Sequence, residues 1–240
     1  MAQIRHIPCH VAIIQDGNRR FASARGIVRQ EGHRAGADRT EQVLDWSREL
    51  GIRHVTLYSF STENLLRDED EVKDLFALFK ERFTKLVTDE RIHRDRIRVR
   101  MVGDRSLLPD DLISVITRAE EATRGYDSYF LNVALAYGGR NEIVRAAKEI
   151  LEKVKTGEYT TTSIGTALVE QHLCADNNLP PVDLVIRTGN EWRTSNFLPW
   201  LANGHESAVY FCAPFWPMFR KIDFLRAIRV YSQRLDTTTR

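Results

Sequence analysis

Two patterns of apolar and polar positions alternate along the chain. Continuous apolar runs, typical of strands buried on both faces of a sheet, occupy residues 10–15, 53–60, 97–103, 130–137 and 183–188, with a weaker run at 206–211. Between these runs, apolar residues recur at helical spacing over about 34–50, 70–90, 109–123, 140–155, 164–173 and 221–234. Strands that alternate with helices predict an α/β fold, in which a mostly parallel sheet carries helices on both faces.

The expected sheet also predicts where the chemistry lies. In open parallel sheets, ligands bind beyond the carboxyl ends of the strands. Polar residues follow the expected strands at 16–20, 60–67, 138–141 and 187–196, so these four segments form the candidate site. No repeat, low-complexity segment or Pro/Gly-rich linker divides the chain, and residues 1–240 are therefore expected to form a single domain.

Composition narrows the class of protein. The 240 residues are 42% hydrophobic and 28% charged, as in a soluble globular protein, and a net charge of +2 gives no global field to recruit nucleic acid. No apolar run is long enough to span a bilayer, and the N-terminal sequence carries no signal-peptide cleavage pattern. Cys9, Cys174 and Cys212 form no CxxC pair, which favours a reducing, cytoplasmic location.

The stretch IIQDGNRRFA ends an apolar run with a single acid and follows it with anion-binding groups. Gly17 allows close backbone approach, and the amides after Asn18 would lie at a helix N-terminus, where anions bind. Arg19 and Arg20 add charge-assisted donors for a phosphate. Asp16 would repel that phosphate unless a divalent cation joined them, as magnesium commonly does. The alternative is that Asp16 only caps a helix and that the arginines are solvated.

Two further clusters follow strand ends. An ordinary capping turn also predicts the composition of the first cluster, which comprises Ser61, Thr62, Glu63 and Asn64. In the second cluster, two arginines flank a Gly-Asn turn beside a hydroxyl group, which suits a second diphosphate: Arg187, Arg193 and Ser195. Arg29 and His33 would extend the first anionic site, although a lone histidine is more often a surface or core residue.

These segments together resemble the cis-prenyltransferases, the family of undecaprenyl and dehydrodolichyl diphosphate synthases. The resemblance covers about residues 8–234 and rests on the ordered motifs HVAIIQDGNRRFA, GHRAGA, LGIRHVTLYSFSTEN, LNVALAYGGRNEI, PVDLVIRTGNEWRTSNFLPW and WPMF. It implies a single α/β domain with a central six-stranded parallel sheet flanked by helices, working as a homodimer. Gln15 and Arg19, where other members commonly carry Met and Gly, are similar to archaeal members.

The resemblance also implies an activity. With magnesium (Mg2+), isopentenyl diphosphate would condense repeatedly with an allylic prenyl diphosphate, geranylgeranyl or farnesyl diphosphate. The product would be a long-chain polycis-polyprenyl diphosphate, the precursor of a glycosyl carrier lipid, and its release would bring peripheral membrane contact.

Residues that match the family motifs then acquire roles. Asp16 would be the catalytic aspartate and, with Glu206, a magnesium ligand. The residues expected to hold the allylic primer are Gly17, Asn18, Arg19, Arg20, Phe21, Arg29 and His33. Those expected in the substrate region are Ser61, Thr62, Glu63, Leu65 and Arg67, and those expected to hold isopentenyl diphosphate are Arg187, Arg193, Thr194 and Ser195.

Asn64 matches the position often named as the proton acceptor in the family. An amide is a poor base, so we expect Asn64 to orient the substrate while a diphosphate oxygen takes the proton. Leu65 stands where Trp is frequent and Met218 where the family pattern has Asp, and these departures leave the primer choice open.

A growing lipid needs an apolar tunnel, and the resemblance places the strand at 130–137 in its wall. Tyr129 shares one strand face with Leu131 and Val133, so a bulky ring there would close the tunnel floor. The alternative is that Tyr129 packs in the core or faces outward. In that case the helix that carries Phe76, Phe79 and Phe83 would limit the chain length.

Other functions compete with this one. A non-catalytic prenyl-binding subunit of the same fold would be expected to lose the first-strand acid or the second arginine cluster, and both are present here. A magnesium-dependent phosphate-ester hydrolase would use Asp16, yet the sequence places no nucleophile or second carboxylate near it. A trans-prenyltransferase is disfavoured because no DDxxD motif occurs.

Overall fold

A six-stranded sheet forms the centre of the computed structural model, which describes residues 4–173, 179–202 and 207–238. All strand pairs in it are parallel, and the strand order is β3-β4-β2-β1-β5-β6. The strands are β1 (His10–Ile14), β2 (His54–Tyr58), β3 (Ile97–Val102), β4 (Tyr129–Ala134), β5 (Leu184–Arg187) and β6 (Ala208–Phe211). Each strand lies close to a predicted apolar run, so the expected fold class is confirmed.

Strand β1 occupies the middle of the sheet, between β2 on one side and β5 on the other. Val11 is aligned with Val55 of β2 and with Leu184 of β5, and every residue of β1 is buried. The chain runs to one side of β1 for the next strands and to the other side for the last two. This change of direction creates a crevice at the carboxyl end of β1, where open parallel sheets bind their ligands.

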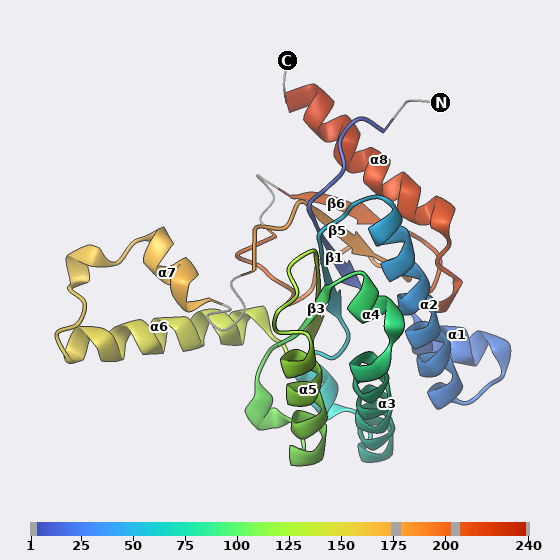
Figure 1. Ribbon diagram of the computed structural model, residues 1–240, viewed down its shortest axis with the longest axis horizontal. Coiled ribbons are helices and arrows are strands. Elements are labelled where there is room, and N and C mark those ends of the chain that lie inside the picture. Colours follow the sequence, from blue (N-terminus) through green and yellow to red (C-terminus); the bar gives the residue numbers. More distant parts are fainter. Residues whose placement is uncertain (1–3, 174–178, 203–206, 239–240) are drawn as a thin grey trace.

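Helices follow most strands (Figure 1). They are α1 (Asn18–Arg25), α2 (Arg29–Glu49), α3 (Glu69–Thr88), α4 (Glu90–Arg94), α5 (Asp110–Ala122), α6 (Gly139–Lys155), α7 (Thr166–His172) and α8 (Lys221–Thr238). Short 3₁₀ turns include η1 (Thr62–Leu66) and η4 (Trp216–Met218). In Figure 1, α6 and α7 extend away from the sheet as an arm. No helix in the described ranges is both long and apolar enough to cross a membrane.

The side chains on the two faces of β1 pack into different hydrophobic cores, because successive side chains of a strand point to opposite sides. Val11 and Ile13 belong to the larger core, which contains buried side chains from α2, α3, α5 and α8. Ala12 and Ile14 belong to a smaller core with Phe197 among its members. Helices α2, α3, α5 and α8 therefore pack on the Val11 face of the sheet.

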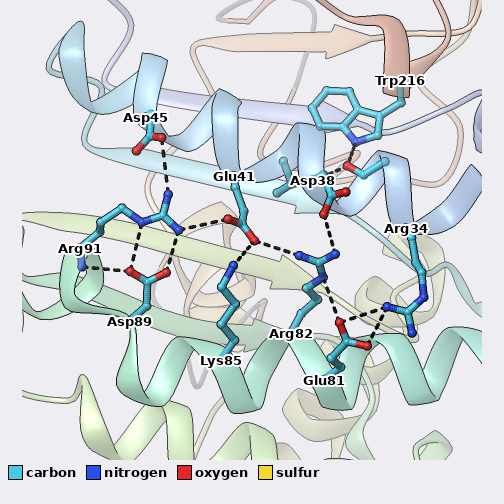
Figure 2. A network of polar contacts seen from close by, with 12 residues as sticks. Arg34, Asp38, Glu41, Asp45, Glu81, Arg82, Lys85, Asp89, Arg91 and Trp216 are labelled. Atoms are coloured by element: carbon cyan, nitrogen blue, oxygen red, sulfur yellow. Dashed lines mark hydrogen bonds and ion pairs between the residues drawn. The ribbon is translucent and has the colours of Figure 1, made fainter. Parts of the chain in front are cut away.

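A row of ion pairs joins α2 to α3 and α4 (Figure 2). Arg82 of α3 binds Asp38 at 2.6 Å and Glu41 at 2.9 Å, both on α2. Arg91 of α4 binds Glu41 at 3.1 Å and Asp45 at 3.6 Å. We call this row the α2–α3 seam; its members are Arg34, Asp38, Glu41, Asp45, Glu81, Arg82, Lys85, Asp89 and Arg91.

Helix α1 begins where the sequence predicted a helix N-terminus, at Asn18, but α1 and most of α4 lie outside the helical ranges expected from periodicity. Of the eight residues of α1, only Ala22 is buried, so the segment shows no repeating apolar face. Helix α4 has five residues and buries only Ile92. Helical periodicity is a weak signal for elements that are this short or this exposed.

Candidate active site

The carboxyl ends of three neighbouring strands converge on one polar cleft of about 810 Å³. Asp16 follows β1, Ser61 follows β2, and Arg187 ends β5. Helix α1 begins immediately after Asp16, so its first backbone amides also lie at the cleft. Three of the four segments expected from the sequence therefore line one space.

Glycine at position 17 is required by its surroundings. Gly17 has a φ of +112°, and a Cβ atom placed there would come within 2.9 Å of the Phe215 backbone. The backbone carbonyl of Asp16 accepts hydrogen bonds from Thr188 Oγ1 at 2.7 Å and from the Trp216 amide at 2.9 Å. These contacts fix the turn from β1 into α1, and with it the direction of the Asp16 side chain.

Two arginines share the Asp16 carboxylate. Arg20 donates to Oδ1 at 3.0 Å, and Arg187 donates to Oδ2 at 2.8 Å. The Asp16 side chain keeps 27% of its surface exposed, whereas Arg187 keeps only 4%. The carboxylate is thus oriented from both sides and remains accessible from the cleft.

Arg187 is held by the loop that follows β5. Its Nη1 donates to Ser195 Oγ at 2.6 Å and to the backbone carbonyl of Arg193 at 2.7 Å. Glu191 of the same loop forms ion pairs with Arg193 and, at 3.4 Å, with Arg20. The second arginine cluster of the sequence therefore lies directly against the first.

On the other side of the cleft, four cationic or titratable groups surround one buried acid, Glu71 of α3. Arg67 lies 3.0 Å and Arg29 3.1 Å from its carboxylate oxygens, followed by His33 at 3.5 Å and Arg19 at 3.6 Å. Burial opposes ionisation of Glu71, but the arginines outweigh it and hold the Glu71 pKa below its usual range. Burial also lowers the pKa of His33, and Arg67 and Arg19 add to that effect.

Asn64 lies in η1 and lines the cleft. Its Oδ1 accepts a hydrogen bond of 3.1 Å from the Ser61 amide. The amide oxygen, which is the acceptor atom of the side chain, is therefore engaged with the backbone. This contact supports an orienting role for Asn64 over a role as base.

Asn196 connects three segments of the site. Its Nδ2 donates to Glu63 Oε1 at 2.9 Å, and its Oδ1 accepts from the Arg140 amide at 2.8 Å. Burial opposes ionisation of Glu63, but hydrogen bonds led by that from Asn196 hold the Glu63 pKa below its usual range. Asn196 thereby links the loop after β5 to η1 and to the start of α6.

A second, smaller cavity of about 160 Å³ adjoins the cleft. The two spaces share lining residues, among them Gln15, Asn18 and Leu75. The smaller cavity is walled mainly by apolar side chains of the sheet, α2 and α3, including Leu44, Leu57, Leu78, Phe79, Phe83, Leu131 and Val133, and it is bordered by members of the α2–α3 seam. A polar compartment thus opens into an apolar one.

Most residues expected at the site line the cleft: Asp16, Gly17, Asn18, Arg19, Arg20, Arg29, His33, Ser61, Glu63, Asn64, Arg67, Arg187, Arg193 and Ser195. Four others lie nearby without lining it: Phe21, Thr62, Leu65 and Thr194. Leu65 packs against the larger core. Glu206 and Cys174 lie outside the described residues, while Cys9 and Cys212 are free thiols.

Sequence reasoning did not single out Glu71, Glu191 or Asn196. Glu71 belongs to the acidic first turn of α3, where acids are common because they complement the helix dipole. Burial distinguishes Glu71 from the neighbouring acids in the structure. The hydrophobicity pattern of the sequence does not show which acid of a polar turn is buried. Asn196 stands in the quoted motif TSNF, but its partners come from distant segments.

Comparison with known proteins identifies the family. Residues 14–238 match the family described as "Putative undecaprenyl diphosphate synthase". The chain belongs to the undecaprenyl diphosphate synthase family. Its members are cis-prenyltransferases, and this protein is an enzyme of that class.

Similar curated proteins include two archaeal enzymes named tritrans,polycis-undecaprenyl-diphosphate synthase (geranylgeranyl-diphosphate specific). That of Methanosarcina mazei is 49% identical over 236 residues, which cover 98% of this chain and 79% of that protein. That of Archaeoglobus fulgidus is 48% identical over 228 residues, which cover 95% and 90%. The expected likeness to archaeal members of the undecaprenyl diphosphate synthase family is confirmed.

Among solved structures of this cis-prenyltransferase fold, lavandulyl diphosphate synthase from Lavandula x intermedia, in complex with dimethylallyl diphosphate, has a TM-score of 0.87 at 34% identity. The match covers 94% of this chain and 95% of that one. A probable undecaprenyl diphosphate synthase from Campylobacter jejuni has a TM-score of 0.76 at 30% identity. These comparisons lend no support to a non-catalytic subunit.

Proposed function

We propose that this cis-prenyltransferase condenses isopentenyl diphosphate repeatedly with geranylgeranyl diphosphate and so makes a long polycis-polyprenyl diphosphate, the precursor of a glycosyl carrier lipid. One observation carries the proposal. An accessible carboxylate at the end of the central strand, Asp16, stands between two arginine groups, and the cleft that holds them opens into an apolar cavity. Two diphosphates and one lipid tail require this combination. The primer is the one named for the archaeal relatives.

The two arginine groups divide the substrates. Arg187 and Arg193, with Ser195 and Thr194 beside them, hold isopentenyl diphosphate. Arg19, Arg29, His33 and Arg67 hold the allylic diphosphate, assisted by the amides of Gly17 and Asn18. Arg20 lies between the groups, because it contacts both Asp16 and Glu191.

Transition-state stabilisation is the main task of these residues. When the allylic carbon–oxygen bond breaks, negative charge grows on the departing diphosphate, and the arginines beside it stabilise that charge. The double bond of isopentenyl diphosphate then attacks the allylic carbon and a proton leaves. Asn64 holds the substrate in place for this step, and a diphosphate oxygen accepts the proton.

Magnesium is the expected cofactor, and Asp16 fits it, because its carboxylate is partly exposed at the cleft. Within the described residues no three His, Cys, Asp or Glu side chains cluster as a closed metal site. Magnesium instead commonly joins one or two carboxylates to substrate phosphates and keeps several waters. Asp16 would hold it, together with Glu206, and the bound ion would neutralise charge on the departing diphosphate.

The apolar cavity receives the lipid tail. A cavity of about 150 Å³ accommodates one benzene molecule. The cavity of about 160 Å³ therefore accommodates about one isoprene unit. A longer chain must therefore widen it, and α2 and α3 are the walls that face each other across it.

The remaining proposals concern assembly and location. We place residues 1–240 in one catalytic domain that works as a homodimer; exposed apolar side chains on and near the projecting arm, Val144, Leu151 and Ile164, support such an interface. The enzyme acts in the cytoplasm, with peripheral membrane contact during release. The exposed Ile27, Val28 and Leu66 support that contact.

Product analysis tests the activity. Purified enzyme receives radiolabelled isopentenyl diphosphate, Mg2+ and, in parallel, geranylgeranyl, farnesyl or dimethylallyl diphosphate. We expect label in a long lipid extractable into organic solvent, with geranylgeranyl diphosphate the best primer. Release of phosphate without lipid would indicate a hydrolase, and an unlabelled short product formed when dimethylallyl diphosphate is supplied would indicate coupling of two allylic substrates.

A further inference from the structure

Glu71 is an acid placed where a diphosphate site would be expected to exclude one. Its side chain is 5% exposed, and it contacts Arg19 of α1, Arg29 and His33 of α2, and Arg67 before α3. All four of these partners line the cleft, whereas Glu71 does not. The carboxylate therefore lies behind a layer of cationic groups and faces them from the protein side.

This arrangement reduces the positive charge available to a ligand. Three arginines with one ionised carboxylate leave a net charge of two, and the carboxylate offers the arginines a permanent anionic partner. An arginine has five N–H donors, so it can hold Glu71 and a phosphate at once, but each bond to one partner weakens attraction to the other. Glu71 thus both positions the arginines and competes with the diphosphate.

The reaction cycle gives this competition a use. Each condensation leaves pyrophosphate in the allylic subsite, and the elongated chain must then bring its own diphosphate there. An anion site without an internal counter-ion would retain pyrophosphate and delay that exchange. We propose that Glu71 is a positioning residue that moderates the allylic subsite and promotes release of pyrophosphate after each condensation. This inference rests on the proposed function of the arginine group.

The decisive measurement is the dissociation constant of inorganic pyrophosphate, determined by calorimetry in EDTA. Glu71→Gln keeps the size of the side chain and removes its charge. We expect pyrophosphate to bind at least about fivefold more tightly, a conservative effect for the loss of a unit charge a few ångströms from the ligand. Glu71→Met, also uncharged and of similar length, is the second variant and should shift affinity in the same direction. Glu71→Asp should restore affinity to near the wild-type value.

A matched control comes from the neighbouring residue. Asp70→Asn removes the same charge from the same turn of α3, but the Asp70 side chain is 91% exposed. We expect it to leave pyrophosphate affinity within about twofold of wild type, because solvent screens exposed charges. Melting curves establish that each variant is folded.

Steady-state kinetics separate this role from a structural one. Glu71→Gln should lower both KM for the allylic primer and kcat, since tighter binding slows exchange, whereas a damaged site would raise KM. Pyrophosphate that binds Glu71→Gln and Glu71→Met no more tightly than wild type would overturn the inference. Wild-type enzyme that binds no pyrophosphate would instead count against the proposed diphosphate subsite itself.

Discussion

Arg187 donates a hydrogen bond of 2.8 Å to Asp16 and, from its other terminal nitrogen, one of 2.6 Å to Ser195. The proposed catalytic carboxylate and the proposed isopentenyl diphosphate subsite therefore share one nearly buried guanidinium. Because Asp16 ends the turn after β1 and Arg187 ends β5, the parallel pairing of these strands sets their separation. If the proposed subsites are right, the sheet register also sets how close the two substrates approach.

Removing the Asp16 carboxylate should abolish the magnesium-dependent step. In Asp16→Ala, the arginines remain, so substrate binding should persist while turnover falls by about a hundredfold to a thousandfold, the range in which loss of a key electrostatic group is measured. Binding by calorimetry and single-turnover rates are measured separately. Near-normal turnover at saturating magnesium would remove Asp16 from its assigned role.

Arg193→Ala and Arg29→Ala should affect different substrates. Arg193 belongs to the loop that holds Arg187, so its loss should raise KM for isopentenyl diphosphate by about tenfold. Arg29 belongs to the Glu71 group, so its loss should raise KM for the allylic primer by a similar factor. Each variant serves as the control for the other. The opposite selectivity would show that the two subsites are exchanged.

Asn64→Asp tests whether the amide is needed as an orienting group. The variant can still accept the hydrogen bond from the Ser61 amide, but it loses the NH2 donors and adds a negative charge near two diphosphates. We expect kcat to fall by about tenfold or more without a gain at high pH. Unchanged turnover and an unchanged pH profile would contradict the orienting role.

Acid should weaken the fold through His54, at the amino end of β2. Burial, with His10, Arg100 and Arg53 nearby, lowers the pKa of His54 to about 4. The unfolded histidine has a pKa of about 6.5, so between about pH 6.5 and 4 the unfolded chain binds a proton that the folded chain excludes. Protonation of His54 therefore does not reduce the free energy of unfolding above about pH 6.5. The free energy of unfolding falls as pH decreases from about 6.5 to 4, by on the order of 2 kcal/mol after allowance for partial exposure.

Thermal unfolding between about pH 7 and 4 checks this expectation. His54→Phe preserves the aromatic stacking on Phe130, whose ring centroid lies 4.3 Å away, and removes the titration. Its melting temperature should depend less on pH than that of wild type. Parallel curves for the two proteins would assign the acid sensitivity to another group.

The α2–α3 seam should influence product length. Arg82→Gln removes ion pairs to Asp38 and Glu41, which weakens the wall beside the apolar cavity. We expect longer chains at an unchanged rate of first condensation, resolved by chromatography of the dephosphorylated products. Lys73→Gln, on the outer surface of the same helix with a side chain that is 70% exposed, is the control. If Arg82→Gln gives the same product distribution as the control Lys73→Gln, the α2–α3 seam does not determine product chain length.

The sequence predicted the strands well because a strand buried on both faces leaves a continuous apolar run, as β1 and β5 do. It also predicted three of the segments that line the cleft, because parallel strands end at one edge, whereas the fourth predicted segment, 138–141, does not line it. The pairing of Asp16 with Arg187 could not be predicted, since it depends on which strands are neighbours. The burial of Glu71 depends on side chains from α1, from α2 and from the residues before α3, so it could not be predicted from the sequence either.

Chain length is the least predictable feature. Tyr129 is partly buried and is absent from the described lining of the apolar cavity, which includes Leu131 and Val133 of the same strand face. Phe79 and Phe83 of α3 do line the cavity. A tunnel floor at Tyr129 stays a prediction, and it would apply only once the cavity has widened. Helix α3, which carries the phenylalanines, borders the cavity as it stands.

The free energies of the contacts around the apolar cavity indicate what could widen it. An exposed ion pair contributes about 0.2–1 kcal/mol, whereas burying one isoprene unit contributes on the order of 4 kcal/mol at about 0.8 kcal/mol for each carbon. Growth of the lipid therefore outweighs the separation of several pairs between α2 and α3. In the proposed reaction, burial of the growing product would therefore supply the free energy that widens the cavity, without an external energy source. The apolar side chains that wall the cavity would contact the lipid, while the ion pairs of the α2–α3 seam at its border can separate and then re-form in water after the lipid departs.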